Sequence, residues 1–186
     1  MAVMEREWND AYPGIIISND DAVNLTFRLT LDEQLKLIAS KPVGALLLKK
    51  IAESRVVTTM AYKVKIQRAK NTLDMSETDP AKRWHAGNVT KGVNMDKAKN
   101  GAGTPSVITY NPNVFLTPDG KRPPYIGLAH ELIHAYRNLY GISGGTTATD
   151  ESMVCGFGQY KDEDITENKI RAEHGIDDRT GYAGVI

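Results

Sequence analysis

The chain lacks the partners needed for an internal disulfide bond, because Cys155 is the single cysteine among its 186 residues. Cys155 lies in the apolar stretch "MVCGFG", which favours a buried, inert thiol over a nucleophile. No apolar run reaches the 18 residues or so of a membrane-spanning helix, so we expect no membrane insertion. The N-terminal stretch is charged and has no apolar core, so we expect no Sec signal peptide.

An excess of charge of either sign is also missing, since 23 Lys and Arg residues balance 23 Asp and Glu residues. This balance does not favour a nucleic-acid partner or a membrane surface. Hydrophobic residues make up 41% of the chain and charged residues 25%, as in soluble globular domains. We therefore expect one monomeric domain over 1–186, with an N-terminal part of helices and strands over 1–70 and a catalytic core over 105–182.

Apolar periodicity predicts a short buried strand over 14–20, followed by two helices. Thr30 and Glu33 form a capping-box pattern that predicts the start of the first helix. Pro42 suits the first turn of the second helix, and the pair is expected to form a hairpin against a sheet.

The rest of the chain divides into β-branched, polar and helix-like stretches. The predicted elements are one or two strands over 55–69, a long polar loop with at most a short hairpin over 70–104, a strand at Ser106–Tyr110, a helix at Tyr125–Tyr140 ended by Gly141, a flexible loop over 141–150, and a helix over 163–174 closed by Gly175.

The stretch "HELIH" carries the pattern His-Glu-x-x-His on the predicted helix. Residues four apart lie on one helix face, so His130 and His134 can bind a single metal ion. Glu131 lies at the edge of that face, where it can take a proton from a metal-bound water and later protonate a leaving amine. Zinc lowers the pKa of such a water to about 7, which makes attack on a carbonyl feasible at neutral pH.

An ordinary amphipathic helix with two surface histidines is the alternative interpretation of this stretch. From the His and Glu content of the chain, the pattern arises by chance in roughly one such sequence in two hundred. The helix also keeps a separate apolar stripe, which can anchor it while the histidines face a cleft: Ile126, Ala129, Leu132, Ile133, Tyr136 and Leu139. Both features favour a zinc hydrolase.

A catalytic zinc site needs a third protein ligand and an open fourth position. The metzincin spacing is absent, because Arg137 and Tyr140 occupy its glycine and third-histidine positions. Acidic or imidazole candidates downstream are Glu151, Glu163, Glu167, Glu173, His174, Asp177 and Asp178. The predicted helix over 163–174 is the preferred source, and the residues alone leave Glu167, Glu163 and His174 open.

Hydrolysis also needs a group that stabilises the oxyanion of the tetrahedral intermediate. Arg179 and Tyr182, in "RTGY", are side chains of a suitable kind. A surface salt bridge with a packed tyrosine is the alternative for this short pattern.

At "LAHELIHAYRNLYGI" the sequence resembles the clostridial neurotoxin light chains, which are zinc endopeptidases. The wider pattern "GAGTPSVITYNPN…RPPYIGLAHELIHA…TENKIRAEHGIDDRTGY" is more similar to effector-type metallopeptidases of Gram-negative bacteria, such as NleD-like type III effectors and Rhs- and VgrG-linked toxin domains. The resemblance covers about residues 100–182.

The resemblance implies an α+β, zincin-like fold, with a mixed sheet, the active-site helix and a second ligand-bearing helix. Strand 106–110 would lie near the sheet edge along the cleft, where an extended peptide adds as a further strand. The implied roles are Zn²⁺ bound by His130, His134 and Glu167, Glu131 as general base and then acid, and Arg179 and Tyr182 at the tetrahedral intermediate.

The expected function is that of a zinc-dependent endopeptidase, a bacterial effector or toxin that cleaves a protein of a target cell. Export without a Sec signal, through a type III or type VI system, follows from the same resemblance. Two alternatives stay open: a zinc amidase or peptidoglycan hydrolase of the bacterial envelope, and a non-enzymatic module that holds zinc with its fourth position closed.

Overall fold

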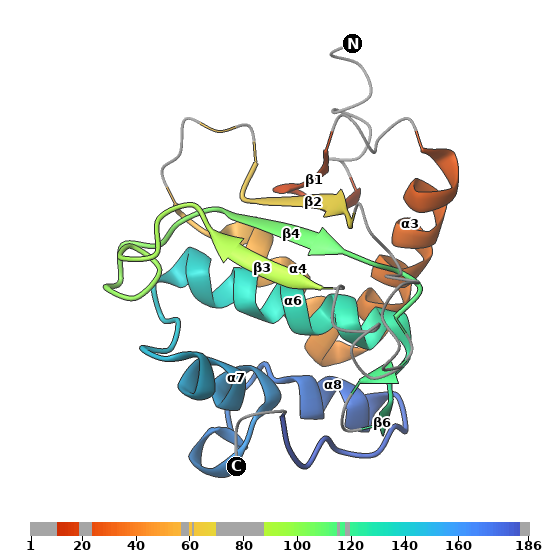
Figure 1. Cartoon of the computed structure of the whole chain (residues 1–186). Coiled ribbons are helices and arrows are strands. Elements are labelled where there is room, and N and C mark those ends of the chain that lie inside the picture. The colour runs from red at the N-terminus through yellow and green to blue at the C-terminus, as the bar shows by residue number, and fades with distance from the viewer. Residues whose placement is uncertain are drawn as a thin grey trace, which may run out of the picture.

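The structure is a computed structural model that describes residues 11–18, 24–56, 60, 62–69, 88–114, 116–117 and 120–182. Its centre is a four-stranded mixed sheet in the order β1-β2-β4-β3 (Figure 1). The strands are β1 (Ile15–Ile17), β2 (Val64–Arg68), β4 (Ser106–Tyr110) and β3 (Val89–Gly92). The first three run parallel, and β3 closes one side antiparallel to β4.

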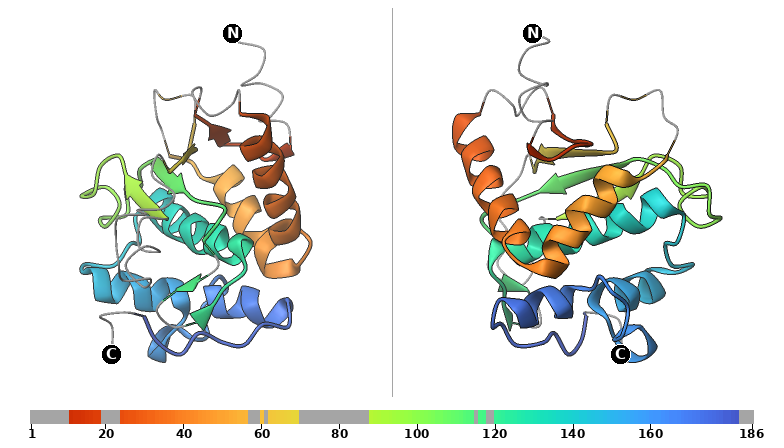
Figure 2. Two further views of the ribbon diagram at one scale, coloured as in Figure 1. Left: turned by 45° about the vertical axis from the view of Figure 1, so that its right-hand side comes forward. Right: turned by 180° about the vertical axis from the view of Figure 1, so that it is seen from behind.

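Alternate side chains of β4 point to opposite faces of the sheet. Ser106, Ile108 and Tyr110 are buried, whereas Val107 and Thr109 between them are half-buried. The buried set faces a layer of helices made of α3 (Leu25–Ala39), α4 (Pro42–Glu53) and α6 (Pro124–Tyr140) (Figure 2). The sheet therefore presents one face to the core and the other face outward.

The predicted helical hairpin is confirmed, and α3 and α4 pack on each other and on α6. The predicted start of the first helix was wrong. Asn24 caps α3 by accepting a hydrogen bond from the Phe27 amide at 3.0 Å, which places Thr30 and Glu33 inside the helix. Burial of Phe27 extends the apolar face one turn upstream of Leu31, which explains the earlier start. Pro42 opens α4 as expected.

The helix that carries His130 and His134 runs from Pro124 to Tyr140 and ends at Gly141, as expected. Gly141 has φ +68°, and a Cβ there would lie 2.5 Å from the Gly101 backbone, so both conformation and space require glycine. This firm end fixes the point at which the chain leaves the helix.

Two further helices, α7 (Thr147–Cys155) and α8 (Glu167–Glu173), lie on the side of α6 away from the sheet (Figure 1). The expected flexible loop over 141–150 already contains the start of α7. The last helix begins at Glu167 rather than at 163, because the Thr166 side chain caps it by accepting from the Lys169 amide. The part of the chain that follows α6 thus folds back over the face of α6 that carries His130 and His134.

Strand β4 is paired on both sides, so the expectation that a peptide adds to Ser106–Tyr110 was wrong. Among the described strands, β1 and β3 each have a partner on one side only, and β3 lies in the region expected to be mostly loop. A small hairpin of β5 (Leu116–Thr117) and β6 (Gly120–Lys121) precedes α6. Among the described helices, none is both long and apolar enough to cross a bilayer.

Candidate metal and catalytic site

His130 and His134 project from successive turns of α6 and turn their Nε2 atoms toward each other. The two Nε2 atoms lie 3.2 Å apart, and the rings meet edge to face. The structure therefore brings the two predicted ligands together on one face of the helix, as their spacing indicates.

Each imidazole is held on its other side by a carboxylate. His130 Nδ1 lies 2.7 Å from Glu167 Oε2, and His134 Nδ1 lies 2.9 Å from Asp150 Oδ2. In a neutral imidazole such a partner keeps the proton on Nδ1, which leaves the lone pair on Nε2. Both lone pairs then point into the same small space, an arrangement suited to a metal ion.

Glu151, on α7, supplies a carboxylate to that space. Its Oε2 lies 3.2 Å from His130 Nε2, and its Oε1 lies 3.3 Å from His134 Nε2. Two ligand atoms bound tetrahedrally to zinc at about 2.05 Å lie about 3.3 Å apart. The three separations in this cluster match that value, so the donor set His130, His134 and Glu151 fits zinc.

The electrostatics of the cluster also favour a cation. Glu151 Oε2 is buried and has no hydrogen bond within the described part of the chain. Burial alone would raise the pKa of Glu151, but the contacts with His130 and His134 outweigh it and hold the pKa well below its usual range. Burial likewise opposes charge on His134, yet Asp150 and Glu151 raise its pKa to about 9. The carboxylates of Asp150 and Glu151 thus favour a positive charge at this site.

Glu167 lies on the Nδ1 side of His130 and does not face the two Nε2 atoms. It is fully buried, and its carboxylate lies 2.7 Å from Arg171 Nε, 3.3 Å from Arg179 Nη1 and 3.9 Å from Arg122 Nη1. The contact with His130, together with the charges of Arg122 and Arg179, holds the pKa of Glu167 well below its usual range despite burial. The geometry therefore favours Glu151 as third ligand and leaves Glu167 to orient His130.

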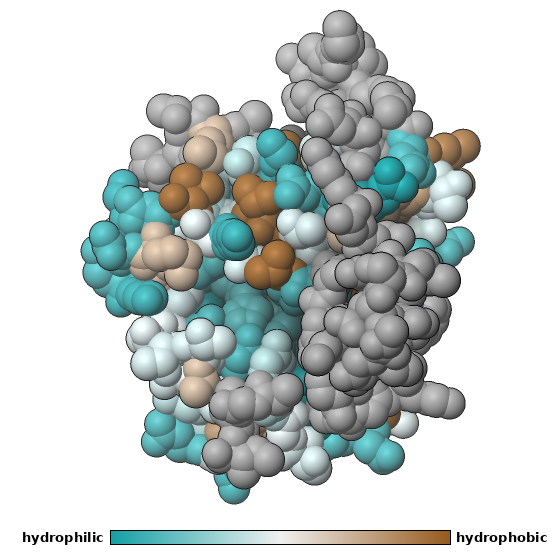
Figure 3. All heavy atoms as spheres, viewed as in Figure 1, coloured by the Kyte–Doolittle hydropathy of each residue, from teal (hydrophilic) through white to brown (hydrophobic). Residues whose placement is uncertain are grey.

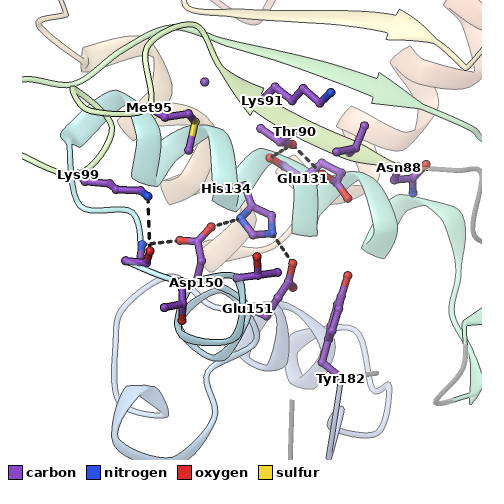
Figure 4. A pocket seen from close by; sticks show the side chains of 16 residues that line it. Asn88, Thr90, Lys91, Met95, Lys99, Glu131, His134, Asp150, Glu151 and Tyr182 are labelled. Atoms are coloured by element: carbon purple, nitrogen blue, oxygen red, sulfur yellow. Dashed lines mark hydrogen bonds and ion pairs between the residues drawn. The ribbon is translucent and has the colours of Figure 1, made fainter. Parts of the chain in front are cut away.

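Glu131 points its carboxylate to the cavity side of α6, toward the edge strand (Figure 4). Thr90, on β3, places its hydroxyl 2.7 Å from Glu131 Oε2 and 3.0 Å from the Glu131 main-chain oxygen. The edge strand thus holds the predicted general base next to the imidazole cluster.

Tyr182 and Arg179 approach from the C-terminal segment. The Tyr182 ring lies parallel to the His130 ring at 6.0 Å, and its hydroxyl points into the cavity (Figure 4). Burial raises the pKa of Tyr182, so the phenol keeps its proton and can donate a hydrogen bond. The Arg179 guanidinium lies 4.4 Å from the Tyr182 ring centroid, over its face, and is bound to Glu167. Arg179 is placed to support its neighbours, and Tyr182 to reach a bound molecule.

Cys155 lies behind the cluster, at the end of α7. Its thiol is buried, as the sequence predicted, and lies 3.8 Å from Glu167 Oε2 and 3.9 Å from Arg179 Nη1. Ligand atoms of His130, Glu151 and Cys155 all lie within 4.8 Å of one another. Burial raises the pKa of the thiol, which opposes a nucleophilic role.

A cavity of about 850 Å³ opens between β3 and the start of α7, with Glu131, His134, Glu151 and Tyr182 in its wall. In the space-filling view the hollow is mostly hydrophilic, and apolar side chains gather above it (Figure 3). The cavity is large enough to receive several residues of a peptide.

Sequence reasoning missed several residues of the site. Thr90, Asp150, Arg122 and Arg171 carried no signal of their own, and Glu151 was one of seven candidates downstream of the motif. Two other candidates lie elsewhere in the described structure. Glu163 pairs with Arg137 at 2.6 Å, and the His174 ring contacts the Tyr125 ring.

Comparison with known proteins places the chain in a family. The model of the peptidase M91 family, described as an effector protein, matches residues 17–164. The chain belongs to the peptidase M91 family of effector proteins. The match includes the histidine motif, Asp150 and Glu151, and it ends before Glu167.

A curated relative and two solved structures are also similar to parts of the chain. The chain is 34% identical over 129 residues to paraclostridial mosquitocidal protein 1 of Paraclostridium bifermentans, covering 58% of this chain and 10% of that protein. The botulinum neurotoxin serotype HA light chain superposes with TM-score 0.50 at 14% identity, covering 88% of this chain and 53% of that one. The type G light chain gives 0.48 at 17% identity, covering 85% and 53%. The chain thus spans a tenth of its sequence relative and about half of these light chains.

Similarity to the serotype HA light chain supports a shared fold, as the motif helix indicated. The family match likewise supports a peptidase of the effector class. The more specific resemblance to Gram-negative NleD-like effectors, and the type III or type VI route, stay predictions.

Proposed function

We propose that the chain is a zinc-dependent endopeptidase that cleaves a protein inside a target cell. The observation that carries the proposal is the meeting of two imidazole Nε2 atoms and the Glu151 carboxylate at 3.2–3.3 Å, beside Glu131. Each imidazole is oriented by its own carboxylate, which is usual for metal-binding histidines.

His130, His134 and Glu151 would hold the zinc ion, in place of the set with Glu167 that the resemblance implied. When bound, zinc supplies Lewis acidity, which lowers the pKa of water and polarises a carbonyl oxygen. With three protein ligands, the site would stay open to water or substrate. Asp150 and Glu167 accept hydrogen bonds from the Nδ1–H groups and fix both rings.

Glu131 acts as the general base that takes a proton from the attacking water, and then gives it to the leaving amine. The Thr90 hydroxyl donates to the Glu131 carboxylate and keeps it on the cavity side of α6. The carboxylate is thereby held in position before substrate arrives, which reduces reorganisation during the reaction.

Tyr182 donates its phenol hydrogen to the oxyanion of the tetrahedral intermediate. Its raised pKa keeps that proton in place at neutral pH. Arg179 acts through Tyr182 and Glu167, because its guanidinium lies over the Tyr182 ring and binds the Glu167 carboxylate.

The substrate enters as an extended strand along β3, whose outer side has no partner strand among the described residues. This strand borders the cavity and carries Thr90, so a peptide added there passes directly over Glu131. An elongated, edge-bound substrate favours cleavage within a chain over removal of a terminal residue.

Membership in a family of effector proteins supports export and delivery into another cell. We keep a type III or type VI system as the proposed route, because the resemblance to effectors delivered in this way implies it. Residues 1–10, on which the expectation of no Sec signal peptide rests, lie outside the described part of the chain.

The test is incubation of zinc-loaded protein with a denatured cell extract, read by mass spectrometry of new peptide termini. We expect internal cleavage that stops when a chelator is added and resumes with zinc. Glu131→Gln should bind zinc as the wild type does and cleave nothing. Cleavage by Glu131→Gln would refute the mechanism. Release of peptidoglycan fragments without protein cleavage would favour an amidase.

A further inference from the structure

Among the described residues no strand pairs with the outer side of β3, and the register of β3 identifies which of its main-chain groups are not used in pairing with β4. The Val93 amide donates to the Pro105 oxygen at 2.8 Å, and the β3–β4 register pairs Lys91 with Val107 and Val89 with Thr109. In an antiparallel pair every second residue bonds to its partner. The main-chain groups of Thr90 and Gly92 therefore face the open edge.

The side chains of β3 point alternately to the two faces of the sheet. One face lies toward the metal site, and the other is the outer face. Thr90 contacts Glu131 on α6, so Val89, Lys91 and Val93 point to the outer face. Val89 is 44% exposed, Val93 is 47% exposed, and Met95 just beyond is 49% exposed. Val89, Lys91 and Val93, called the outer row below, are all exposed.

An unpaired strand with exposed apolar side chains is normally covered or protected by several charges, because it invites pairing with other chains. In this row only Lys91 is charged. Lys91 forms no hydrogen bond or ion pair within the described part of the chain. The acidic groups of the cavity are already engaged, with Glu131 bound to Thr90 and Asp150 to His134.

We propose that the outer row selects the substrate of the proposed endopeptidase, a segment with apolar, acidic and apolar side chains at alternate positions. Side chains of an added strand lie beside those of β3 on the same face. The acidic side chain lies beside Lys91, and the apolar ones beside Val89 and Val93. The intervening substrate residue, beside Thr90, points toward the zinc ligands and Glu131.

The inference rests on the proposed function, so its test uses both binding and cleavage. A peptide library from a digested proteome is cleaved by zinc-loaded wild type, Lys91→Glu and Lys97→Glu. Lys97 is exposed and lies outside β3. Lys97→Glu therefore changes the net charge as Lys91→Glu does, without altering the strand. Two synthetic peptides that differ only by Glu or Lys at the selected position are then bound to the same proteins in a Glu131→Gln background.

We expect the wild type and Lys97→Glu to prefer the Glu peptide by roughly 2- to 10-fold, and Lys91→Glu to reverse this preference. The apolar preference two residues to either side should persist in all three proteins. An unchanged acidic preference in Lys91→Glu, or no preference in the wild type, would overturn the inference. Selective binding without any cleavage by the wild type would sustain the inference and overturn the proposed endopeptidase.

Discussion

Replacing Glu151 and Glu167 separately should have different effects, because one carboxylate faces the Nε2 atoms and the other faces an Nδ1 atom. Zinc sites of four ligands bind with about 10–16 kcal/mol, or about 3 kcal/mol for each ligand. Loss of the carboxylate in Glu151→Ala should therefore weaken zinc binding at least about 100-fold. Glu167→Gln keeps an acceptor for His130 Nδ1, so we expect a loss of about 10-fold.

In the metal-free protein, Glu167→Gln should lower the free energy of unfolding more than Glu151→Ala does. The Glu167 carboxylate is buried against Arg171 and Arg179, and removing its charge leaves these guanidinium groups uncompensated. Breaking a buried pair in this way costs about 3–5 kcal/mol. Glu151→Ala leaves those contacts intact but removes the contacts with His130 and His134, which keep Glu167 and Asp150 as partners, so the free energy of unfolding should fall less than in Glu167→Gln.

Both quantities are measurable on the same preparations. Competition with a fluorescent chelator gives zinc affinity, and urea unfolding of the metal-free proteins gives stability. Wild-type zinc affinity in Glu151→Ala, together with a 100-fold loss in Glu167→Gln, would refute the reasoning and return the third ligand to Glu167.

Three further predictions concern the base, the oxyanion and the fold. Thr90→Val removes a hydrogen bond to the Glu131 carboxylate, so it should lower kcat roughly 10- to 100-fold with zinc affinity unchanged. Thr90→Ser keeps the hydroxyl and should retain most of the wild-type rate. Equal rates in the two variants would contradict this role of Thr90. Tyr182→Phe should lower kcat about 100-fold or more with little change in KM, and a selective rise in KM would instead indicate a binding role. Gly141→Ala should lower the thermal midpoint by several degrees because of its φ of +68°, while Gly145→Ala, with open space around it, should not.

The motif helix was predictable because its signals are local. Apolar residues recur with helical period, prolines precede the first turn, and Gly141 supplies the left-handed end. Strand 106–110 was equally predictable from its β-branched residues and the Asn-Pro-Asn that follows. These features depend on neighbours in sequence, and the structure keeps the predicted bounds within one residue.

The surroundings of the motif depend on contacts between distant segments. Strand β3 has only four residues and is stabilised by pairing with β4, so its sequence alone predicts a loop. Helix α7 has little apolar periodicity, so the sequence predicts a flexible loop at Asp150. The sequence offers Glu151 only as one of several possible ligands, although both residues lie on α7. Sequence spacing places Glu167 near the histidines but does not say which ring nitrogen it meets.

The most direct test of the central claim is a crystal structure of the zinc-loaded protein, with diffraction measured on both sides of the zinc absorption edge. We predict one strong anomalous peak about 2.0–2.2 Å from His130 Nε2, His134 Nε2 and a Glu151 oxygen, with Glu167 bound to His130 Nδ1. A zinc ion held by Glu167 or by Cys155, or no zinc between the two imidazoles, would contradict the account.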